Sequence, residues 1–349
     1  MNEKEFAGLP ASGPMPTLTK KDFMSDQLVR WCPGCGDFAI LATVQKVLPT
    51  LGIPREDIVF ISGIGCSSRF PYYMNTNGFH SIHGRAPTFA TGLKVSNPKL
   101  QVWVVTGDGD GLSIGGNHLI HALRRNVDIK VLLFNNKIYG LTKGQASPTS
   151  EVGKKTKSTP QGSVDFPLNP ISLALASEAT FVARTIDTDI PHFTKVLERA
   201  ARHKGSAIIE IFQNCIVFND GAWTDVSEKA VRDEHNVDLV HGQPLIFGKD
   251  KNKGIRLNGF KPEVVEFPAG QPPKDLIVYD ETSPALAQIM CHMARPEFPV
   301  AQGVFRSVQR PALHELIDGQ VAEAREKAGG KPDLQKLLKG SETWTVAAQ

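Results

Sequence analysis

Short apolar runs alternate with amphipathic stretches along the first two thirds of the chain. The runs, rich in Val, Ile and Phe, are typical of buried strands and lie at 58–61, 102–105, 129–134, 181–184 and 207–212. Apolar positions at helical spacing separate them, over about 37–52, 87–95, 119–123, 171–176 and 193–203. Asp37 is predicted to cap the first of these helices. The alternation predicts an α/β fold, with a parallel sheet and helices on both faces.

The pattern changes toward both ends of the chain. Residues 1–30 are proline-rich and mixed in charge, so we expect an extended N-terminal arm followed by one domain over 31–225. Beyond it, glycine and proline become frequent, and 226–349 is predicted to be an extension or arm that wraps the core or a partner, with a helix around 313–327. The Ser-, Thr-, Pro- and Lys-rich segment 145–170 is expected to be a long loop near a functional site.

Composition narrows the class of protein. The chain has 349 residues, of which 41% are hydrophobic, so it can bury a large core. A net charge of +3 is too balanced to indicate nucleic-acid or membrane binding. Because the sequence lacks an apolar run long enough for a transmembrane helix and its opening residues lack the apolar core of a signal peptide, we expect a cytoplasmic protein.

A glycine turn follows the strand predicted at 102–105. It reads Gly107, Asp108, Gly109 and Asp110, and Asn136 is the second residue after the run at 129–134. Neighbouring parallel strands end at one edge of a sheet, so Asp108 and Asn136 are expected to lie together. Such glycines let backbone N–H groups approach a phosphate, and a carboxylate beside a diphosphate requires a cation between them. The pattern favours a Mg²⁺–diphosphate site over a plain Asp-Gly turn.

The chain has five cysteines, of which two lie in a tight loop and two come after predicted strands. Cys32 and Cys35 form a close pair, whereas Cys66 and Cys215 each follow a predicted strand. Four thiolates suit Zn²⁺ or an iron–sulfur cluster, and one pair with two distant single residues favours a [4Fe–4S] cluster over a structural zinc. The low, odd number argues against a disulfide framework. Cys291 lies in an apolar segment and is predicted to be a buried core thiol.

Several motifs then occur in order: WCPGCG at 31–36, GCSSR at 65–69, FHSIHGRA at 79–86, GDGD at 107–110 and YGLTKGQASPTS at 139–150. Together they resemble the β subunits of 2-oxoacid:ferredoxin oxidoreductases, most closely the 2-oxoglutarate type. The GDGD motif and Asn136 are also similar to the thiamine diphosphate (TPP) signature. The resemblance covers roughly residues 20–225 and implies a TPP-binding domain; residues 226–349 match no motif.

The resemblance implies specific residue roles. It makes Cys32, Cys35, Cys66 and Cys215 the ligands of one [4Fe–4S] cluster, and Asp108, Asn136 and the main-chain carbonyl of Ile138 the ligands of Mg²⁺. The expected TPP-binding residues are Gly65, Ser67, His83, Gly107, Asp108, Gly109, Asp110, Asn136, Ile138, Tyr139, Gly140, Leu141 and Thr142.

The resemblance also implies a reaction. A 2-oxoacid is oxidatively decarboxylated with coenzyme A, which for 2-oxoglutarate gives succinyl-CoA and CO₂, and electrons pass through the cluster to ferredoxin. The glutamate that activates TPP in such enzymes belongs to a separate domain, and this chain contains one α/β unit. We therefore expect that residue on a partner α subunit, in an assembly of two α and two β subunits, and expect the chain to be inactive alone.

Three residues are candidates for contact with substrate, coenzyme A or TPP. Arg69 and Lys143 lie on predicted loops at the site and could pair with a distal carboxylate or with phosphates. His83 precedes the helix that Pro87 opens and could meet diphosphate or substrate. The alternative for Arg69 and Lys143 is a solvated loop charge, and the alternative for His83 is a side chain that hydrogen-bonds loop carbonyls.

Three other functions stay open at this point. The substrate could be pyruvate or a branched 2-oxoacid, which a panel of acids would distinguish. The chain could be a TPP decarboxylase or carboligase subunit with a structural zinc, which iron and zinc analysis would reveal. It could also be an electron-transfer module without TPP, although Asp108 and Asn136 argue against that.

Overall fold

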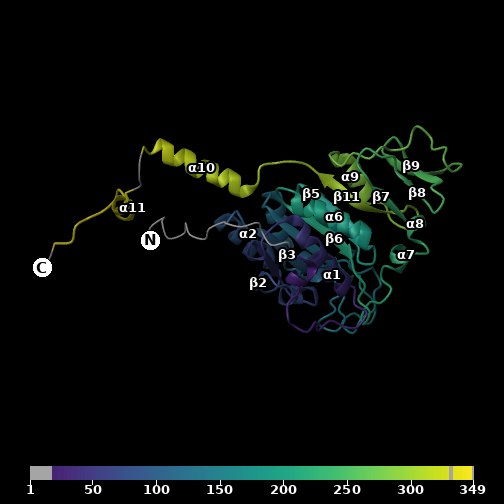
Figure 1. The fold of residues 1–349 in the computed structure, drawn as a ribbon, viewed down its shortest axis with the longest axis horizontal. Coiled ribbons are helices and arrows are strands. Elements are labelled where there is room, and N and C mark those ends of the chain that lie inside the picture. Colours follow the sequence, from purple (N-terminus) through teal and green to yellow (C-terminus); the bar gives the residue numbers. More distant parts are fainter. Residues whose placement is uncertain (1–17, 330–332, 348–349) are drawn as a thin grey trace.

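The computed structural model describes residues 18–329 and 333–347 (Figure 1). Within this part of the chain, a sheet of eight strands is flanked by helices, and a second sheet has three strands. The predicted α/β fold is confirmed. Residues 1–17, most of the predicted N-terminal arm, lie outside the described residues; the rest of that arm includes a short 3₁₀ helix, η1 (Lys20–Phe23).

The main sheet is parallel except where β11 meets β5. Its strands, in spatial order, are β2 (Asn77–His80), β1 (Ile58–Ser62), β3 (Gln101–Gly107), β4 (Ile129–Asn135), β6 (Ala207–Phe212), β5 (Phe181–Ile186), β11 (Val300–Ser307) and β7 (Asn236–Leu239). The five strands predicted from apolar runs are all present. They are buried along almost their whole length because helices cover both faces of the sheet, as parallel sheets require.

Helices on the two faces enclose two separate apolar cores. On one face lie α1 (Asp37–Val47) and α6 (Ile190–Arg202). On the other lie α2 (Ala86–Ser96), α4 (Gly116–Arg124), α5 (Pro170–Ala176) and α9 (Pro284–Cys291). All of these helices except α9 were predicted from their apolar spacing. Shorter helices are α3 (Asp108–Leu112), α7 (Thr224–Ser227), α8 (Arg232–His235), and the 3₁₀ helices η2 (Leu48–Leu51), η3 (Arg55–Asp57) and η4 (Ser67–Tyr73).

The predicted capping role of Asp37 is wrong. Gly36 occupies the cap position, and its N–H donates to the carbonyl oxygen of Asn214 at 3.1 Å. Asp37 is instead the first residue of α1 and is only 2% exposed. The tight turn made by Cys35 and Gly36 already directs the chain into the helix, so the Asp37 carboxylate does not act as a cap. It lines the candidate site described below.

The chain beyond residue 225 contributes to the main sheet. Strand β11 pairs with β5 and β7, so the predicted boundary at 225 does not mark the end of the sheet. Strands β7 and β11 were not predicted from the sequence because they contain buried polar residues with specific partners. Gln302 bonds to Asp238 at 2.5 Å, and Arg306 pairs with Glu178 at 3.0 Å.

The remaining elements of this region lie outside the main sheet. The second sheet consists of β8 (Ile246–Phe247), β9 (Lys253–Asn258) and β10 (Lys261–Glu266). The predicted helix at 313–327 is present as α10 (Leu313–Lys327), which extends away from the body (Figure 1). It is followed by α11 (Leu334–Lys339).

A buried polar cluster closes the end of the sheet where β4, β5 and β6 begin. Asp128 pairs with Lys130 at 2.7 Å and with Lys94 at 3.0 Å. The nearby His203 ring lies 2.8 Å from the hydroxyl of Thr180. Burial, reinforced by the charge of Lys130, lowers the pKa of His203 to about 4.

The lowered pKa of His203 predicts a pH-dependent stability. The folded state binds a proton on His203 less readily than the unfolded state does, so the contribution is complete above about pH 6.5 and is lost as the pH falls toward 4. We expect the free energy of unfolding to drop by up to about 2 kcal/mol from this group. Urea unfolding of the chain and of His203→Gln at pH 7, 6 and 5 measures it. Parallel curves for the two proteins would contradict the prediction.

Candidate active site

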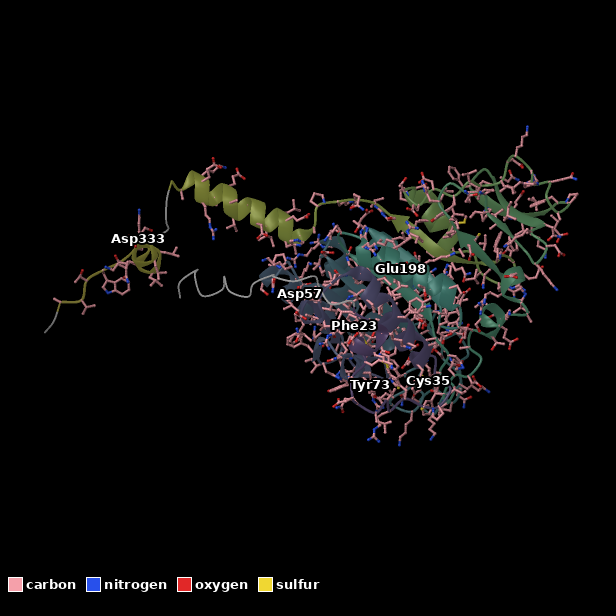
Figure 2. All side chains as sticks on the ribbon, in the orientation of Figure 1. Phe23, Cys35, Asp57, Tyr73, Glu198 and Asp333 are labelled. Atoms are coloured by element: carbon pink, nitrogen blue, oxygen red, sulfur yellow. The ribbon has the colours of Figure 1, made fainter. Side chains whose placement is uncertain are left out.

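The candidate site lies where the parallel strands end at their carboxyl edge. The segments that follow β1, β3, β4 and β6 all meet there, as expected for an open α/β sheet. Figure 2 places Cys35 toward this loop end of the body and Asp57, which directly precedes β1, toward the opposite end. Two adjoining cavities open among these loops.

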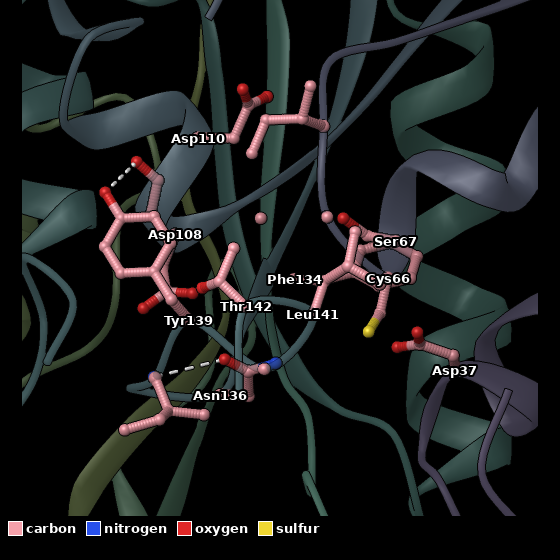
Figure 3. A pocket seen from close by; sticks show the side chains of 16 residues that line it. Asp37, Cys66, Ser67, Asp108, Asp110, Phe134, Asn136, Tyr139, Leu141 and Thr142 are labelled. Carbon is pink, nitrogen blue, oxygen red and sulfur yellow. Dashed lines mark hydrogen bonds between the residues drawn. The ribbon is translucent and has the colours of Figure 1, made fainter. Parts of the chain in front are cut away.

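The first cavity, called the glycine-turn cavity below, is drawn in Figure 3. It contains every residue predicted for TPP contact except His83. Its lining residues are Asp37, Ile64, Gly65, Cys66, Ser67, Gly107, Asp108, Gly109, Asp110, Phe134, Asn136, Ile138, Tyr139, Gly140, Leu141 and Thr142. Gly109 is required by packing, because a β-carbon there would lie 2.2 Å from the ring of Tyr139. The glycines therefore keep the backbone close to whatever the cavity holds.

Asp108 is held in a fixed orientation at the start of α3. Its Oδ2 accepts hydrogen bonds from the hydroxyls of Ser147 at 2.5 Å and Thr149 at 2.6 Å. Burial raises the pKa of Asp108 to about 6, although both hydroxyls act in the opposite direction. A buried carboxyl of this kind gains most from a nearby cation, which would stabilise its charged form.

Asn136 and Asp110 have different surroundings. The amide of Asn136 donates to Oε1 of Gln213 at 2.8 Å, and its Oδ1 accepts from the N–H of Ile138 at 3.2 Å. The carboxylate of Asp110 accepts from the N–H of Gly84 and the hydroxyl of Thr106, both at 2.7 Å. Asp110 thus braces the turn. Asp108, Asn136 and Ile138 line the same cavity, and carboxylate, amide and carbonyl oxygens are the ligand types that Mg²⁺ accepts.

All four predicted cysteine ligands line the second cavity, called the cysteine cavity below, which has a volume of about 250 Å³. Cys32 and Cys35 come from the loop before α1, Cys66 from the turn after β1, and Cys215 from the segment after β6. A β-carbon on Gly140 would lie 3.4 Å from the Sγ of Cys215 and 3.9 Å from that of Cys66. The remaining lining residues are Arg30, Trp31, Asp37, Arg69, Asn136, Gly140, Leu141, Gln213, Ile216, Val217 and Phe218.

The thiols of Cys35 and Cys66 are poor acids in the protein alone. Burial, followed by the charge of Asp37, raises the pKa of Cys66 to about 11 and raises that of Cys35 further. A metal centre would have to supply the positive charge that stabilises the thiolates. The cavity therefore fits a group that carries such charge.

The two cavities share one wall. Asp37, Cys66, Asn136, Gly140 and Leu141 line both of them. Groups bound in the two cavities would be direct neighbours, separated only by these side chains and the Gly140 backbone.

The three predicted substrate-contact residues are placed differently. Arg69 lines the cysteine cavity, and its guanidinium donates to the carbonyl oxygen of Arg30 at 2.9 Å. Lys143 and His83 are exposed and stand outside the lining of both cavities. Their contact with substrate stays a prediction.

Sequence reasoning missed four residues at the site. Ser147 and Thr149 hold Asp108 from within the segment that was predicted only as a loop near the site. Asp37 lines both cavities, and its Oδ2 is buried without a hydrogen-bond partner. Gln213 directly follows β6 and lies two residues before Cys215. Its position beside this predicted ligand was the one signal in the sequence that could have identified Gln213.

Comparison with known proteins identifies the family. The model of the thiamine pyrophosphate enzyme C-terminal TPP-binding domain matches residues 63–211. The 2-oxoglutarate oxidoreductase subunit KorB of Mycobacterium tuberculosis is 54% identical over 330 residues, which cover 93% of this chain and 88% of that protein. The chain belongs to the family of 2-oxoacid:ferredoxin oxidoreductase β subunits. The resemblance seen in the sequence motifs is confirmed, and the chain is an enzyme subunit.

Two other proteins of this family are also similar to the chain. A β subunit of 2-oxoacid:ferredoxin oxidoreductase 1 from Aeropyrum pernix is 52% identical over 190 residues, 54% of this chain and 60% of that protein. Among solved structures, the 2-oxoglutarate:ferredoxin oxidoreductase of Magnetococcus marinus, with 2-oxoglutarate, coenzyme A and succinyl-CoA bound, is 32% identical with a TM-score of 0.74. The match covers 94% of this chain and 98% of the other, so it extends well beyond residue 225.

Each helix in the part of the chain that the structure describes is too short or too polar to span a bilayer.

Proposed function

We propose that this chain is the β subunit of a cytoplasmic 2-oxoglutarate:ferredoxin oxidoreductase. With an α subunit, it would convert 2-oxoglutarate and coenzyme A to succinyl-CoA and CO₂ and deliver electrons to ferredoxin, reversibly in principle. The observation that carries the proposal is the shared wall between the glycine-turn cavity and the cysteine cavity. An enzyme that moves electrons from an organic cofactor to an inorganic centre needs the two side by side.

In the glycine-turn cavity, Asp108, Asn136 and the carbonyl of Ile138 would hold Mg²⁺. Ser147 and Thr149 fix the Asp108 carboxylate, and Gln213 fixes the Asn136 amide, so the oxygen donors are arranged before the metal binds. The backbone of the glycine turn at the start of α3 supplies N–H groups for a diphosphate. When bound, TPP supplies the carbanion that adds to the carbonyl of a 2-oxoacid.

In the cysteine cavity, Cys32, Cys35, Cys66 and Cys215 would hold one [4Fe–4S] cluster. Trp31 donates to the carbonyl oxygen of Cys66 at 2.7 Å and so fixes the turn that carries this ligand. Gly140 keeps the wall thin, because a β-carbon there would already be in van der Waals contact with the sulfurs of Cys66 and Cys215. A thin wall favours electron transfer between the two sites.

The relatives support the proposed substrate and partner. The Magnetococcus marinus enzyme binds 2-oxoglutarate and coenzyme A, and the Mycobacterium tuberculosis relative is also a 2-oxoglutarate enzyme subunit. Arg69, which lines the cysteine cavity, is proposed to contact a substrate carboxylate or a coenzyme A phosphate, and Lys143 and His83 are further candidates on exposed segments. The glutamate that activates TPP would come from the α subunit, so the β chain alone would be inactive.

The proposal is tested with the complex of this chain and its α subunit, purified without oxygen. We expect iron, acid-labile sulfide and TPP in the complex, and ferredoxin reduction that depends on both coenzyme A and 2-oxoglutarate. Pyruvate and a branched 2-oxoacid are assayed in parallel, because faster turnover of either would replace 2-oxoglutarate as the substrate. Zinc in place of iron, or turnover by the β chain alone, would overturn the assignment.

A further inference from the structure

Gln213 lines the cysteine cavity and contacts residues of both cavities. It directly follows β6 and is 1% exposed. Its Oε1 accepts a hydrogen bond from the amide of Asn136 at 2.8 Å. Its Nε2 donates to the Sγ of Cys35 at 3.3 Å and to the carbonyl oxygen of Asn214 at 2.6 Å. One side chain thus joins a candidate Mg²⁺ ligand to a candidate cluster ligand.

The direction of these hydrogen bonds is fixed by the neighbours. Because the N–H of Ile138 donates to Oδ1 of Asn136, the Asn136 NH₂ group is the one that faces Gln213. Gln213 must accept there with its oxygen, which leaves its own NH₂ group for the Asn214 carbonyl and the Cys35 sulfur. The main chain is held as well, since the N–H of Gln213 donates to the carbonyl oxygen of Asn135 at 3.0 Å. The amide is therefore clamped in one orientation.

We infer that Gln213 is a positioning residue that acts on both cofactor sites of the proposed function. Toward the glycine-turn cavity, it holds the Asn136 amide so that its oxygen stays oriented for the metal. Toward the cysteine cavity, its N–H stabilises negative charge on the Cys35 sulfur. Because reduction adds negative charge to a cluster, an N–H donor to a ligand sulfur raises the reduction potential.

The choice of glutamine follows from its two unlike ends. A glutamate could accept from Asn136 but could not donate to Cys35, and its charge would lie near the buried carboxylate of Asp37, which lines the same cavity. A methionine has a similar length and would lose both hydrogen bonds. These two substitutions separate the two ends of the side chain.

The inference is tested with Gln213→Met and Gln213→Glu in the full complex. Both are expected to lower the equilibrium constant for cluster reduction by about tenfold, which is about 59 mV for one electron, in a redox titration followed by electron paramagnetic resonance. TPP affinity with Mg²⁺ is expected to fall about 10-fold or more in Gln213→Met, as for loss of a partner that orients a metal ligand, and to fall less in Gln213→Glu. A residue that only braced the end of β6 would not produce this split.

Asn214→Ala is the matched control. The Asn214 side chain bonds to Asp220 and Gly221, and this variant is expected to keep the wild-type potential. Wild-type potentials in both Gln213 variants with full iron content would overturn the inference. So would complete loss of iron from both variants with an intact fold, because Gln213 would then be needed for assembly and not for tuning. Absence of iron and TPP from the wild-type complex would instead overturn the proposed function.

Discussion

Asp108→Ala is expected to remove TPP from the complex. The substitution deletes a candidate metal ligand whose orientation is set by the hydroxyls of Ser147 and Thr149. Loss of a residue that only supports a metal ligand typically weakens binding or activity by about 10- to 100-fold, so loss of the ligand itself should exceed about 100-fold in TPP affinity and in turnover. Titration of TPP into the cofactor-depleted complex in the presence of Mg²⁺ measures the change.

Ser147→Ala is the graded comparison for this experiment. It removes one donor to Oδ2 of Asp108 and leaves the carboxylate in place. Its effect should therefore stay within about 10- to 100-fold. The magnesium assignment would be lost if Asp108→Ala bound TPP as tightly as Ser147→Ala did.

Arg184→Met is expected to lower the free energy of unfolding more than any other single substitution proposed for this chain. Arg184 on β5 pairs with Glu210 on β6 at 2.7 Å, and the exposed fractions of their side chains are 7% and 2%. The substitution leaves a buried carboxylate without its cation, which typically costs about 3–5 kcal/mol. Urea unfolding of the chain at neutral pH gives the free energy of unfolding directly.

The double variant Arg184→Met with Glu210→Gln separates charge from packing. With both charges removed, the side chain at 210 can still accept a hydrogen bond from Asn135, which donates to Glu210 at 2.7 Å. Most of the stability should return, because a buried pair is often worth little more than a neutral replacement. A double variant as unstable as Arg184→Met would place the loss in packing around Phe212 and Phe305.

Local sequence patterns were sufficient to predict the central strands and most residues of the candidate site. The strand predicted at 207–212 has the observed bounds of β6, and the helix predicted at 313–327 has those of α10. The glycine turn and Asn136 were placed together correctly because parallel strands must end at one edge of a sheet. These inferences need only the period of apolar positions and the topology of α/β folds.

What the sequence could not supply were contacts between distant segments. Ser147 and Thr149 reach Asp108 only because the loop that contains them folds back over the glycine turn. Asp37 has the pattern of a helix cap, and its burial against two cavities depends on how the loop of Cys32 and Cys35 packs. Strand β11 was hidden because its buried Gln302 and Arg306 interrupt the apolar run and find partners far along the chain.

The late arrival of β11 has a consequence for biosynthesis. Ser307 of β11 pairs with Phe181 of β5. A growing chain on the ribosome therefore completes β5 long before the neighbouring strand β11 has been made. Until then β5, which is buried over its whole length in the finished protein, has an unsatisfied edge that invites association with other nascent chains. Pairing across so long an intervening stretch is also slow to form. Early capture by a chaperone would protect the chain during this interval.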